Sequence, residues 1–159
     1  MKWDALAEER CSMARSLAVV GDRWTLMILR DCFLGVRRFD AFQARLGISR
    51  TIVAERLGRL VDAGVLAKVL YQDHPVRHEY RLTDKGRDLH PVVLAIVHWG
   101  DRHYAGEAGA PLIHTHRGCG CDFQPVQTCS ACGDVVTARD VEVRIGPGAG
   151  VGMAALSAR

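Results

Sequence analysis

Two groups of residues in this 159-residue chain have the types and spacing needed to bind something. The first is a run of arginines at positions 37, 38, 45, 50, 56 and 59, opposed within the same stretch by Asp40 and Glu55 alone. Positive charge concentrated in this way is typical of surfaces that contact nucleic-acid phosphates. The second group is a pair of short motifs, HRGC at 116–119 and CSAC at 129–132, each followed by glycine. Soft ligands separated by two residues are typical of tetrahedral zinc sites.

The arginines fall on a predicted helix-turn-helix. Residues 39–46 have helical spacing, Gly47 ends them in a tight turn, and Ser49 can cap a second helix over residues 49–62. One side of this second helix is apolar and should pack on the domain core: Ile52, Val53, Leu57, Leu60 and Val61.

The other side of the helix over 49–62 carries Thr51, Ala54, Glu55 and Gly58. Small residues there allow a helix backbone to lie deep in a major groove, while Arg50, Arg56 and Arg59 flank the strip and can reach phosphates. The pattern predicts a recognition helix; the alternative is an ordinary solvated surface helix.

A hairpin is predicted directly after this helix. Residues 65–71 and 79–82 have strand composition, whereas Pro75 removes a backbone donor and keeps the intervening residues out of the strands. The resulting wing, residues 71–79, has a basic tip at Arg77 that we expect to contact a minor groove or a phosphate. A solvated hairpin tip is the alternative.

The remaining helices are predicted from caps and spacing. Gly21 ends a helix over 11–20, Asp22 caps one over 23–33, and Thr83 caps a long helix over 84–104. The apolar side of this last helix is wider than one small domain can cover, so we expect it to pair with a second copy of the chain. Pro91 near its middle predicts either a kink or a break into two helices.

Composition places limits on the class of protein. With 48% hydrophobic and 25% charged residues, the chain is expected to be globular and soluble. The charged N-terminus has no signal-peptide pattern, so a cytoplasmic location is expected, with the six cysteines reduced or bound to metal. No phosphate loop, nucleophile elbow or HExxH motif is present, and an enzyme is not expected.

Residues 11–104 resemble the HxlR-type winged helix-turn-helix regulators, relatives of the MarR group. The resemblance is carried by Cys11, GDRWTLMILRD at 21–31, RRFDAF at 37–42, GISRTIVAERLGRLVDAGVL at 47–66, HEYRLTDKG at 78–86 and WGD at 99–101. These pieces cover roughly 60% of the chain in the family's order. The family's proline after the first cysteine is replaced here by Ser12, and its proline-containing wing stretch survives as HPVRH.

The resemblance implies a homodimer that binds operator DNA. A response to redox chemistry or to a small molecule is a further hypothesis. Several members of the family sense oxidants through a cysteine near the position of Cys11, so this residue is a redox-sensing candidate; the alternative is an unreactive, half-buried thiol. The candidate DNA-binding residues are Arg37, Arg38, Ser49, Arg50, Thr51, Ala54, Glu55, Arg59 and Arg77.

The C-terminal part looks like a small zinc ribbon fused behind the winged domain. A linker at 105–111 should separate the winged domain, residues 1–104, from this extension at 112–146, and residues 147–159 should form a disordered tail. The expected ligands of a structural Zn²⁺ are Cys119, Cys129 and Cys132 with His116 as the fourth, while Cys121 and His114 are rivals for that place. A metal-free hairpin is the alternative.

The predicted fold is therefore mainly α with a small β-wing, followed by a small β-rich appendage resembling a zinc ribbon. The predicted function is that of a homodimeric DNA-binding transcriptional regulator. The alternative is a winged-helix protein-interaction module that does not bind DNA sequence-specifically. An apolar patch at 49–59 would favour a protein partner, but the sequence there is basic and small.

Overall fold

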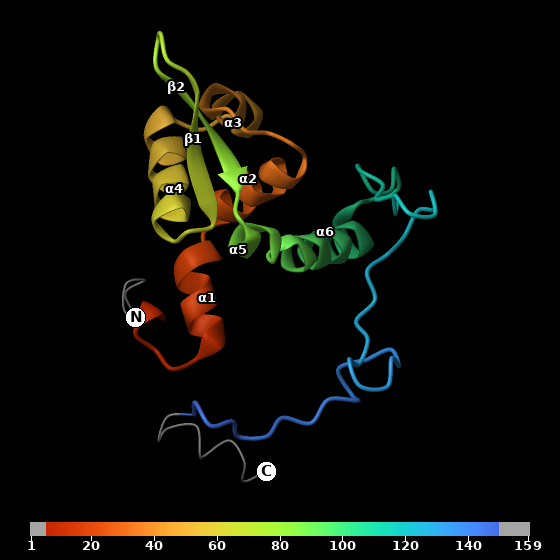
Figure 1. Cartoon of the computed structure of the whole chain (residues 1–159). Coiled ribbons are helices and arrows are strands. Elements are labelled where there is room, and N and C mark those ends of the chain that lie inside the picture. Colours follow the sequence, from red (N-terminus) through yellow and green to blue (C-terminus); the bar gives the residue numbers. More distant parts are fainter. Residues whose placement is uncertain (1–5, 150–159) are drawn as a thin grey trace. The chain divides into compact units, whose positions relative to one another are not determined.

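The computed structural model describes residues 6–149 of the chain. It divides into two compact units, residues 1–93 and 94–159, and the boundary falls within the last helix. Within the described range, no helix is both long enough and apolar enough to cross a membrane. The elements (Figure 1) are α1 (Ser12–Val20), α2 (Arg23–Phe33), α3 (Phe39–Leu46), α4 (Arg50–Asp62), β1 (Leu66–Gln72), β2 (Arg77–Leu82), α5 (Asp84–Arg87) and α6 (His90–Tyr104).

The helix-turn-helix begins and ends at the predicted residues because the caps are local. The Asp22 carboxylate accepts hydrogen bonds from the backbone N–H groups of Trp24 and Thr25, at 3.0 and 3.2 Å, and so caps α2. Gly47 ends α3 at φ +63°, a left-handed conformation that is open to glycine because it has no Cβ. Ser49 Oγ then accepts from the backbone N–H of Ile52 and caps α4.

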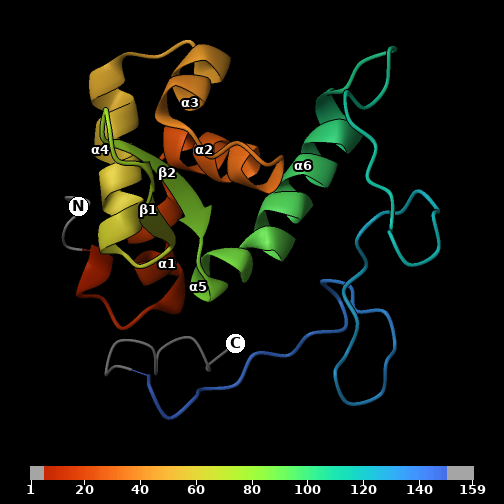
Figure 2. The same ribbon diagram turned by 45° about the horizontal axis from the view of Figure 1, so that its top comes forward.

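Helix α4 packs on α2, α3 and β1 in the first unit (Figure 2), and the core lies between these elements. The predicted fold class, mainly helical with a two-stranded wing, is confirmed for the winged unit. Side chains with 2% exposure or less make up this core: Ile28, Leu29, Phe42, Val53, Leu57, Leu60, Val65 and Leu66.

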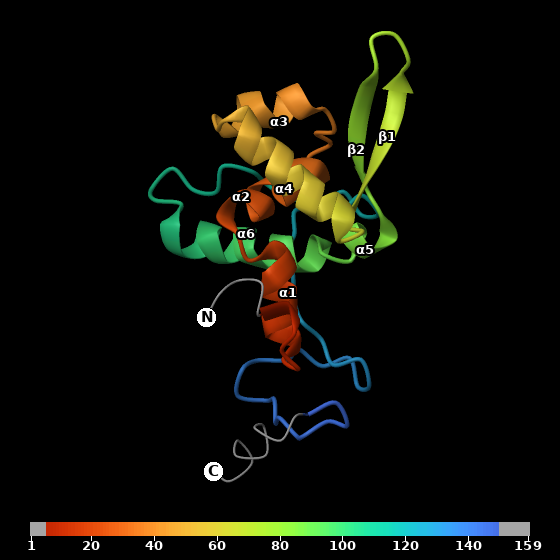
Figure 3. The same ribbon diagram turned by 90° about the vertical axis from the view of Figure 1, so that its left-hand side faces the viewer.

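The wing is an antiparallel pair whose register joins Leu66 to Leu82 and Leu70 to His78, with an irregularity before Gln72. The predicted strand ends were wrong, because β1 includes Gln72 and β2 begins at Arg77. Pro75 lies in the turn, where its missing N–H breaks no ladder hydrogen bond, so the strands continue almost to the tip. Figure 3 shows the ribbon standing beside α4 and extending beyond it.

The predicted long helix over 84–104 is broken into α5 and α6. Thr83 caps α5 as predicted, since its hydroxyl accepts from the backbone N–H of Gly86. Pro91 has no N–H to donate to the carbonyl of Arg87, and it lies in the first turn of α6, where that N–H is not needed. Of the two predicted alternatives, a kink or a break, the structure has the break.

The extension has less regular structure than a β-rich domain. Between residues 112 and 146 its β-structure consists of two isolated bridges, Thr115 with Asp122 and Thr128 with Val135. The linker predicted at 105–111 lies inside the second unit. Of the segment predicted to be a disordered tail, residues 150–159 lie outside the described residues.

A buried carboxylate ties α2 to α3. The Asp31 side chain has 0% exposure and accepts hydrogen bonds from Arg30 at 2.7 Å and from Arg45 of α3 at 3.3 Å. An ionised carboxylate is costly to bury unless it is paired, so the two guanidinium groups make this position possible. Sequence analysis did not predict this cluster.

We expect Asp31→Ala to lower the free energy of unfolding by about 2 kcal/mol, because it removes charge-assisted hydrogen bonds from a buried site. The matched control is Asp40→Ala, whose carboxylate is paired with Arg50 but is 83% exposed and should change stability by less than about 1 kcal/mol. Urea unfolding followed by circular dichroism measures both variants. Equal losses would show that the Asp31 cluster does not stabilise the fold.

Candidate nucleic-acid interface

Helix α4 presents two chemically different faces. Val53, Leu57 and Leu60 have no exposed surface, in agreement with the predicted packing face. The predicted outer face is accessible: Thr51, Ala54 and Glu55 are exposed, and Gly58 is partly exposed. Apart from the neighbouring backbone of α4, no atom of the described residues lies within 4 Å of the position where a Gly58 side chain would begin, so the helix surface is open at this point. This face could approach another macromolecule closely.

Arg50, at the first turn of α4, is held by weak and exchangeable contacts. Its guanidinium lies 3.0 Å from the Asp40 carboxylate and 4.7 Å from the ring centroid of Phe39. The Arg50 and Asp40 side chains are 66% and 83% exposed, and such ion pairs contribute less than about 1 kcal/mol. A phosphate could therefore replace Asp40 at little cost.

Arg56 is not free to contact a phosphate, and its predicted role in reaching phosphates was wrong. Its side chain is 17% exposed and lies 2.8 Å from Asp22 at the start of α2. It also lies 2.8 Å from Glu55. Arg59, by contrast, is 63% exposed and pairs with Glu55 at 3.0 Å across one helical turn. Arg59 thus remains at the surface beside the outer face, whereas Arg56 is structural.

The Asp22–Arg56 contact helps to lower the pKa of Asp22. Burial acts to raise the pKa of Asp22, but backbone hydrogen bonds from Thr25 and Trp24 and the charge of Arg56 outweigh it, so this pKa lies below its ordinary value. A carboxyl with a lowered pKa stabilises the folded state at neutral pH, and this contribution is lost as the pH falls through the lowered pKa. The contact holds the start of α2 against α4.

The segment before α3 is joined to the wing. The Tyr80 N–H donates to the Arg37 carbonyl at 2.8 Å, and the Arg38 guanidinium lies 4.9 Å from the ring centroid of Tyr71. Arg37 and Arg38 are exposed, and Arg77 is exposed at the start of β2. The fold thus brings the arginines at the start of α3 to the wing strands.

The two cysteines of the winged unit differ in environment. Cys11 is exposed at the residue that precedes α1. Cys32 is buried in α2, and burial together with the negative charge of Asp31 raises the pKa of its thiol to about 12. Reaction with an oxidant requires a thiolate and solvent access, so Cys32 is unsuited to it.

The predicted metal ligands lie on two separate turns of the second unit. On the first turn, His116 Nδ1 lies 3.3 Å from Cys119 Sγ. On the second, backbone N–H groups of Cys132 and Ala131 hydrogen-bond to the Cys129 sulfur and lower the pKa of its thiol. Among residues 6–149, no three His, Cys, Asp or Glu side chains are gathered closely enough to hold one metal ion. The structure therefore forms each half of the predicted ligand set and does not bring the halves together.

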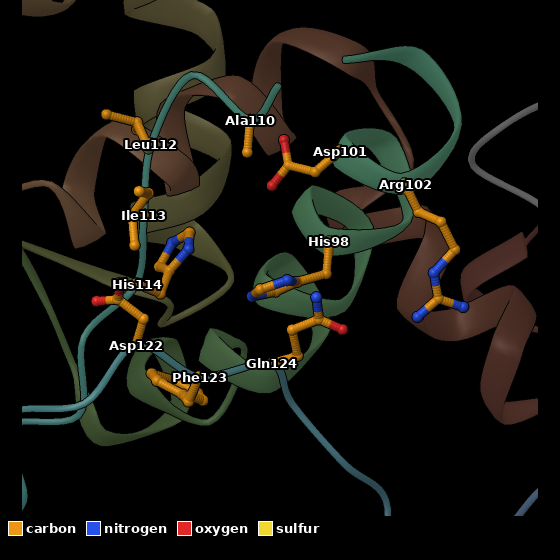
Figure 4. Close-up of a pocket in the computed structure, with 10 residues that line it drawn as sticks. All are labelled: His98, Asp101, Arg102, Ala110, Leu112, Ile113, His114, Asp122, Phe123 and Gln124. Carbon is orange, nitrogen blue, oxygen red and sulfur yellow. The ribbon is translucent and has the colours of Figure 1, made fainter. Parts of the chain in front are cut away.

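The two rival ligands make other contacts. His114 and the α6 residue His98 line a cavity of about 430 Å³ in the second unit, and Figure 4 shows their rings next to each other. The ring centroids are 5.2 Å apart, and His98 Nε2 and His114 Nδ1 are buried with no hydrogen-bond partner among residues 6–149. The Cys121 thiol lies 3.6 Å from the Cys119 carbonyl.

The structural roles of Asp31, Arg45 and Arg56 were not predicted from the sequence. A signal was present for Asp31, which follows the apolar Ile28 by three residues and so falls on the inward face of its helix. An acidic residue on such a face predicts a buried partner, but it does not say which arginine supplies the partner.

Comparison with known proteins gives a consistent result. Residues 19–108 match the family described as HxlR-like helix-turn-helix. The chain is 44% identical over 137 residues to the uncharacterized HTH-type transcriptional regulator Rv3095 of Mycobacterium tuberculosis, covering 86% of this chain and 87% of that protein.

Solved structures are also similar. The crystal structure of PA1607 has a TM-score of 0.80 at 36% identity, covering 88% of this chain and 98% of that one. The redox regulator HypR in its reduced form has a TM-score of 0.55 at 28% identity, covering 58% of this chain and 92% of that one.

Proposed function

Because this chain belongs to the HxlR-like helix-turn-helix family, we propose that it is a transcriptional regulator that reads operator DNA with α4. A DNA-binding regulator, and not an enzyme, agrees with its relatives, which are named HTH-type transcriptional regulators. The observation that carries the finer proposal is the outer face of α4, where exposed small residues lie between exchangeable arginines.

In this proposal α4 enters the major groove by its N-terminal half, as recognition helices do. Ser49 and Thr51 lie at the N-terminal end of α4, which in this proposal contacts base edges or phosphates. The small side chain of Ala54 allows the helix backbone to approach the DNA closely. Glu55 can accept a hydrogen bond from a cytosine amino group. Its carboxylate is paired with Arg56 and Arg59, which offsets its repulsion from the phosphates.

Positioning contacts come from the arginines outside α4. Arg50 and Arg59 flank the groove-facing strip and are assigned to phosphates. Arg37 and Arg38 precede α3, next to the wing strands, and Arg77 extends from the wing. Phosphate contacts of this kind fix the register of a protein on DNA and make affinity fall with rising salt.

We expect Gly58→Ala to change stability and DNA binding in opposite directions. Alanine meets no atom within 4 Å and favours the helix, so the free energy of unfolding should rise by about 0.5–1 kcal/mol. The added methyl group lies on the proposed groove face and should weaken operator binding by about tenfold, equivalent to about 1.4 kcal/mol. Thermal unfolding and fluorescence anisotropy with an operator selected from random duplexes measure the two effects.

Ser16→Ala is the control, because Ser16 is exposed within α1 and is not among the residues proposed to contact DNA or the second copy, and alanine favours the helix. It should stabilise the protein and leave operator affinity unchanged. Unchanged affinity in Gly58→Ala would contradict the placement of α4. A selection that returns no preferred sequence would instead favour the protein-interaction module.

We further propose that the regulator is a homodimer that pairs through α6. Val92, Ile96 and Trp99 follow one another at helical spacing and are 47%, 47% and 56% exposed. Large apolar side chains arranged in this way on a surface helix are typical of a protein interface. Two copies would present two recognition helices to half-sites one turn of DNA apart.

Trp99→Asp should convert the dimer to a monomer at micromolar concentration, because it places a charge in the apolar contact. Val76→Asp makes the same kind of change at an exposed apolar residue of the wing, 67% exposed, and should remain dimeric. Sedimentation equilibrium distinguishes the two states. A Trp99→Asp protein that stays dimeric would show that the copies pair elsewhere.

A redox response through Cys11 is the second part of the proposal. The exposed position of Cys11 favours it, as does the similarity to HypR, which is named a redox regulator. The exposed Cys11 contrasts with Cys32, whose burial keeps it from reacting.

Dilute peroxide should lower operator affinity in the wild-type protein and leave Cys11→Ser unaffected, because the serine hydroxyl does not oxidise. Cys32→Ser serves as the control and should still respond. Mass spectrometry after brief iodoacetamide treatment should find Cys11 modified and Cys32 intact. A peroxide response that persists in Cys11→Ser would assign sensing to another residue.

A further inference from the structure

The extension contains a structural repeat with a period of thirteen residues. The bridge between Thr115 and Asp122 recurs between Thr128 and Val135. Three backbone hydrogen bonds of the first segment recur thirteen residues later. The bond from His116 N–H to Cys121 O recurs as Cys129 N–H to Asp134 O, and the bond from Gly120 N–H to His116 O recurs as Gly133 N–H to Cys129 O. The bond from Phe123 N–H to His114 O recurs as Val136 N–H to Gln127 O. Residues 114–123 and 127–136 thus form two equivalent hairpins, called here turn 1 and turn 2.

The repeat identifies equivalent positions. His116 in turn 1 corresponds to Cys129 in turn 2, and Cys119 corresponds to Cys132. The following glycines, Gly120 and Gly133, have nearly the same left-handed conformation, at φ +73° and +79°. Each turn therefore presents one pair of soft donors on the same backbone frame.

The same comparison decides between the rival ligands. Cys121 corresponds to Asp134 and His114 to Gln127, so neither falls at a donor position of turn 2. His114 also faces His98 across the cavity of the second unit. The equivalence with Cys129 therefore selects His116 as the fourth donor.

The position of the His116 ring in turn 1 requires a glycine at position 118. A Cβ at Gly118 would lie 2.8 Å from His116 Cε1, so glycine is what lets the imidazole fold back over its own turn. The folded ring places His116 Nδ1 3.3 Å from Cys119 Sγ. In turn 2 the smaller Cys129 replaces the imidazole, and the position equivalent to Gly118 is occupied by Ala131.

The two turns have little apolar surface with which to hold each other. Phe123, Val126 and Val135 are 37%, 61% and 61% exposed. The backbone hydrogen bonds of the hairpins end at residues 123 and 127, so residues 124–126 form the link between them. A module of this size is normally stabilised by a metal or a disulfide.

We infer that turn 1 and turn 2 are the two halves of one structural zinc site in each chain, with His116, Cys119, Cys129 and Cys132 as its ligands. One nitrogen and three sulfur donors suit tetrahedral Zn²⁺. Tetrahedral zinc places bound nitrogen and sulfur atoms about 3.6 Å apart, close to the spacing that His116 and Cys119 already have. Rotation at residues 124–126 brings turn 2 to turn 1, and binding releases the thiol protons of three cysteines to solvent.

The metal joins the two hairpins and does no chemistry, because four protein donors leave no position for a substrate. The extension is not peculiar to this chain, since the alignment of 137 residues with Rv3095 is longer than the predicted winged domain of 104 residues. The inference does not depend on DNA binding, so its failure would leave the proposed regulator untouched.

Zinc content of the full-length protein, purified after growth with zinc, tests the inference. We expect one zinc per chain by elemental analysis. Cys132→Ala and His116→Ala should each weaken affinity for zinc by about 100-fold or more, measured by competition with a chromophoric chelator. Cys121→Ala, which removes a neighbouring thiol at a non-donor position, should bind zinc as the wild type does.

Cobalt substitution reports the donor set independently of affinity. The sulfur-to-cobalt charge-transfer absorption grows with the number of bound thiolates, so His116→Cys should retain metal and absorb more strongly than the wild type. Gly118→Ala should weaken metal binding by displacing the imidazole, whereas Ala131→Gly should not. In the zinc-bound protein, iodoacetamide should modify Cys121 and leave Cys119, Cys129 and Cys132 unreacted.

Several outcomes would overturn the inference. Zinc-free protein after growth with zinc, or equal losses in Cys121→Ala and Cys132→Ala, would exclude this ligand set. A site shared between two chains would appear as recovered zinc binding when a chain lacking His116 and Cys119 is mixed with one lacking Cys129 and Cys132. Failure of that mixture to bind zinc would support a site within one chain.

Discussion

The geometry of the winged unit depends on two carboxylates of one helix. Asp31, buried in α2, accepts hydrogen bonds from Arg45 of α3, and Asp22, at the start of α2, pairs with Arg56 of α4. Both helices of the helix-turn-helix are therefore attached to the same scaffold by charged contacts as well as by the apolar core. Breaking an ion pair at a buried carboxylate is more costly than breaking an exposed one, and this applies to Asp31, whereas Asp22 is partly exposed.

The same energetic difference sorts the arginines by role. Arg45 and Arg56 pair with carboxylates that are buried or partly buried, and releasing either arginine would remove a charged partner from such a carboxylate. Arg50 and Arg59 pair with exposed acids, and water replaces such contacts at a cost of less than about 1 kcal/mol. A count of positive charges treats all four alike. Burial of the partner decides which arginines can leave the protein surface for a phosphate.

The parts of the fold that could be predicted from sequence are those decided within one helical turn. Gly47 and Ser49 act on their own neighbours, so the positions of α3 and α4 follow from residue type and spacing. The role of Arg56 could not be predicted, because its partner lies 34 positions away and periodicity places it at the edge of the outer face. The paired turns of the extension were visible as two motifs, but their equivalence depends on backbone hydrogen bonds, which spacing of donors does not specify. Sequence spacing placed His116 as the expected fourth ligand with Cys121 and His114 as rivals, and the hairpin geometry adds a reason to prefer His116.

The junction after α4 links the position of α4 to that of α5. The Thr83 hydroxyl donates to the Gly64 carbonyl at 2.7 Å, and Lys85 Nζ donates to the Ala63 carbonyl at 2.8 Å, so α5 is bonded to the residues that end α4. Gly86 packs directly beneath the Val65 carbonyl, where any side chain would overlap that oxygen. The glycine at this close approach and the two side chains bonded to the end of α4 couple the position of α5 to that of α4. A change that displaces α5 would therefore alter the angle at which α4 is presented, with no change in the residues proposed to contact DNA.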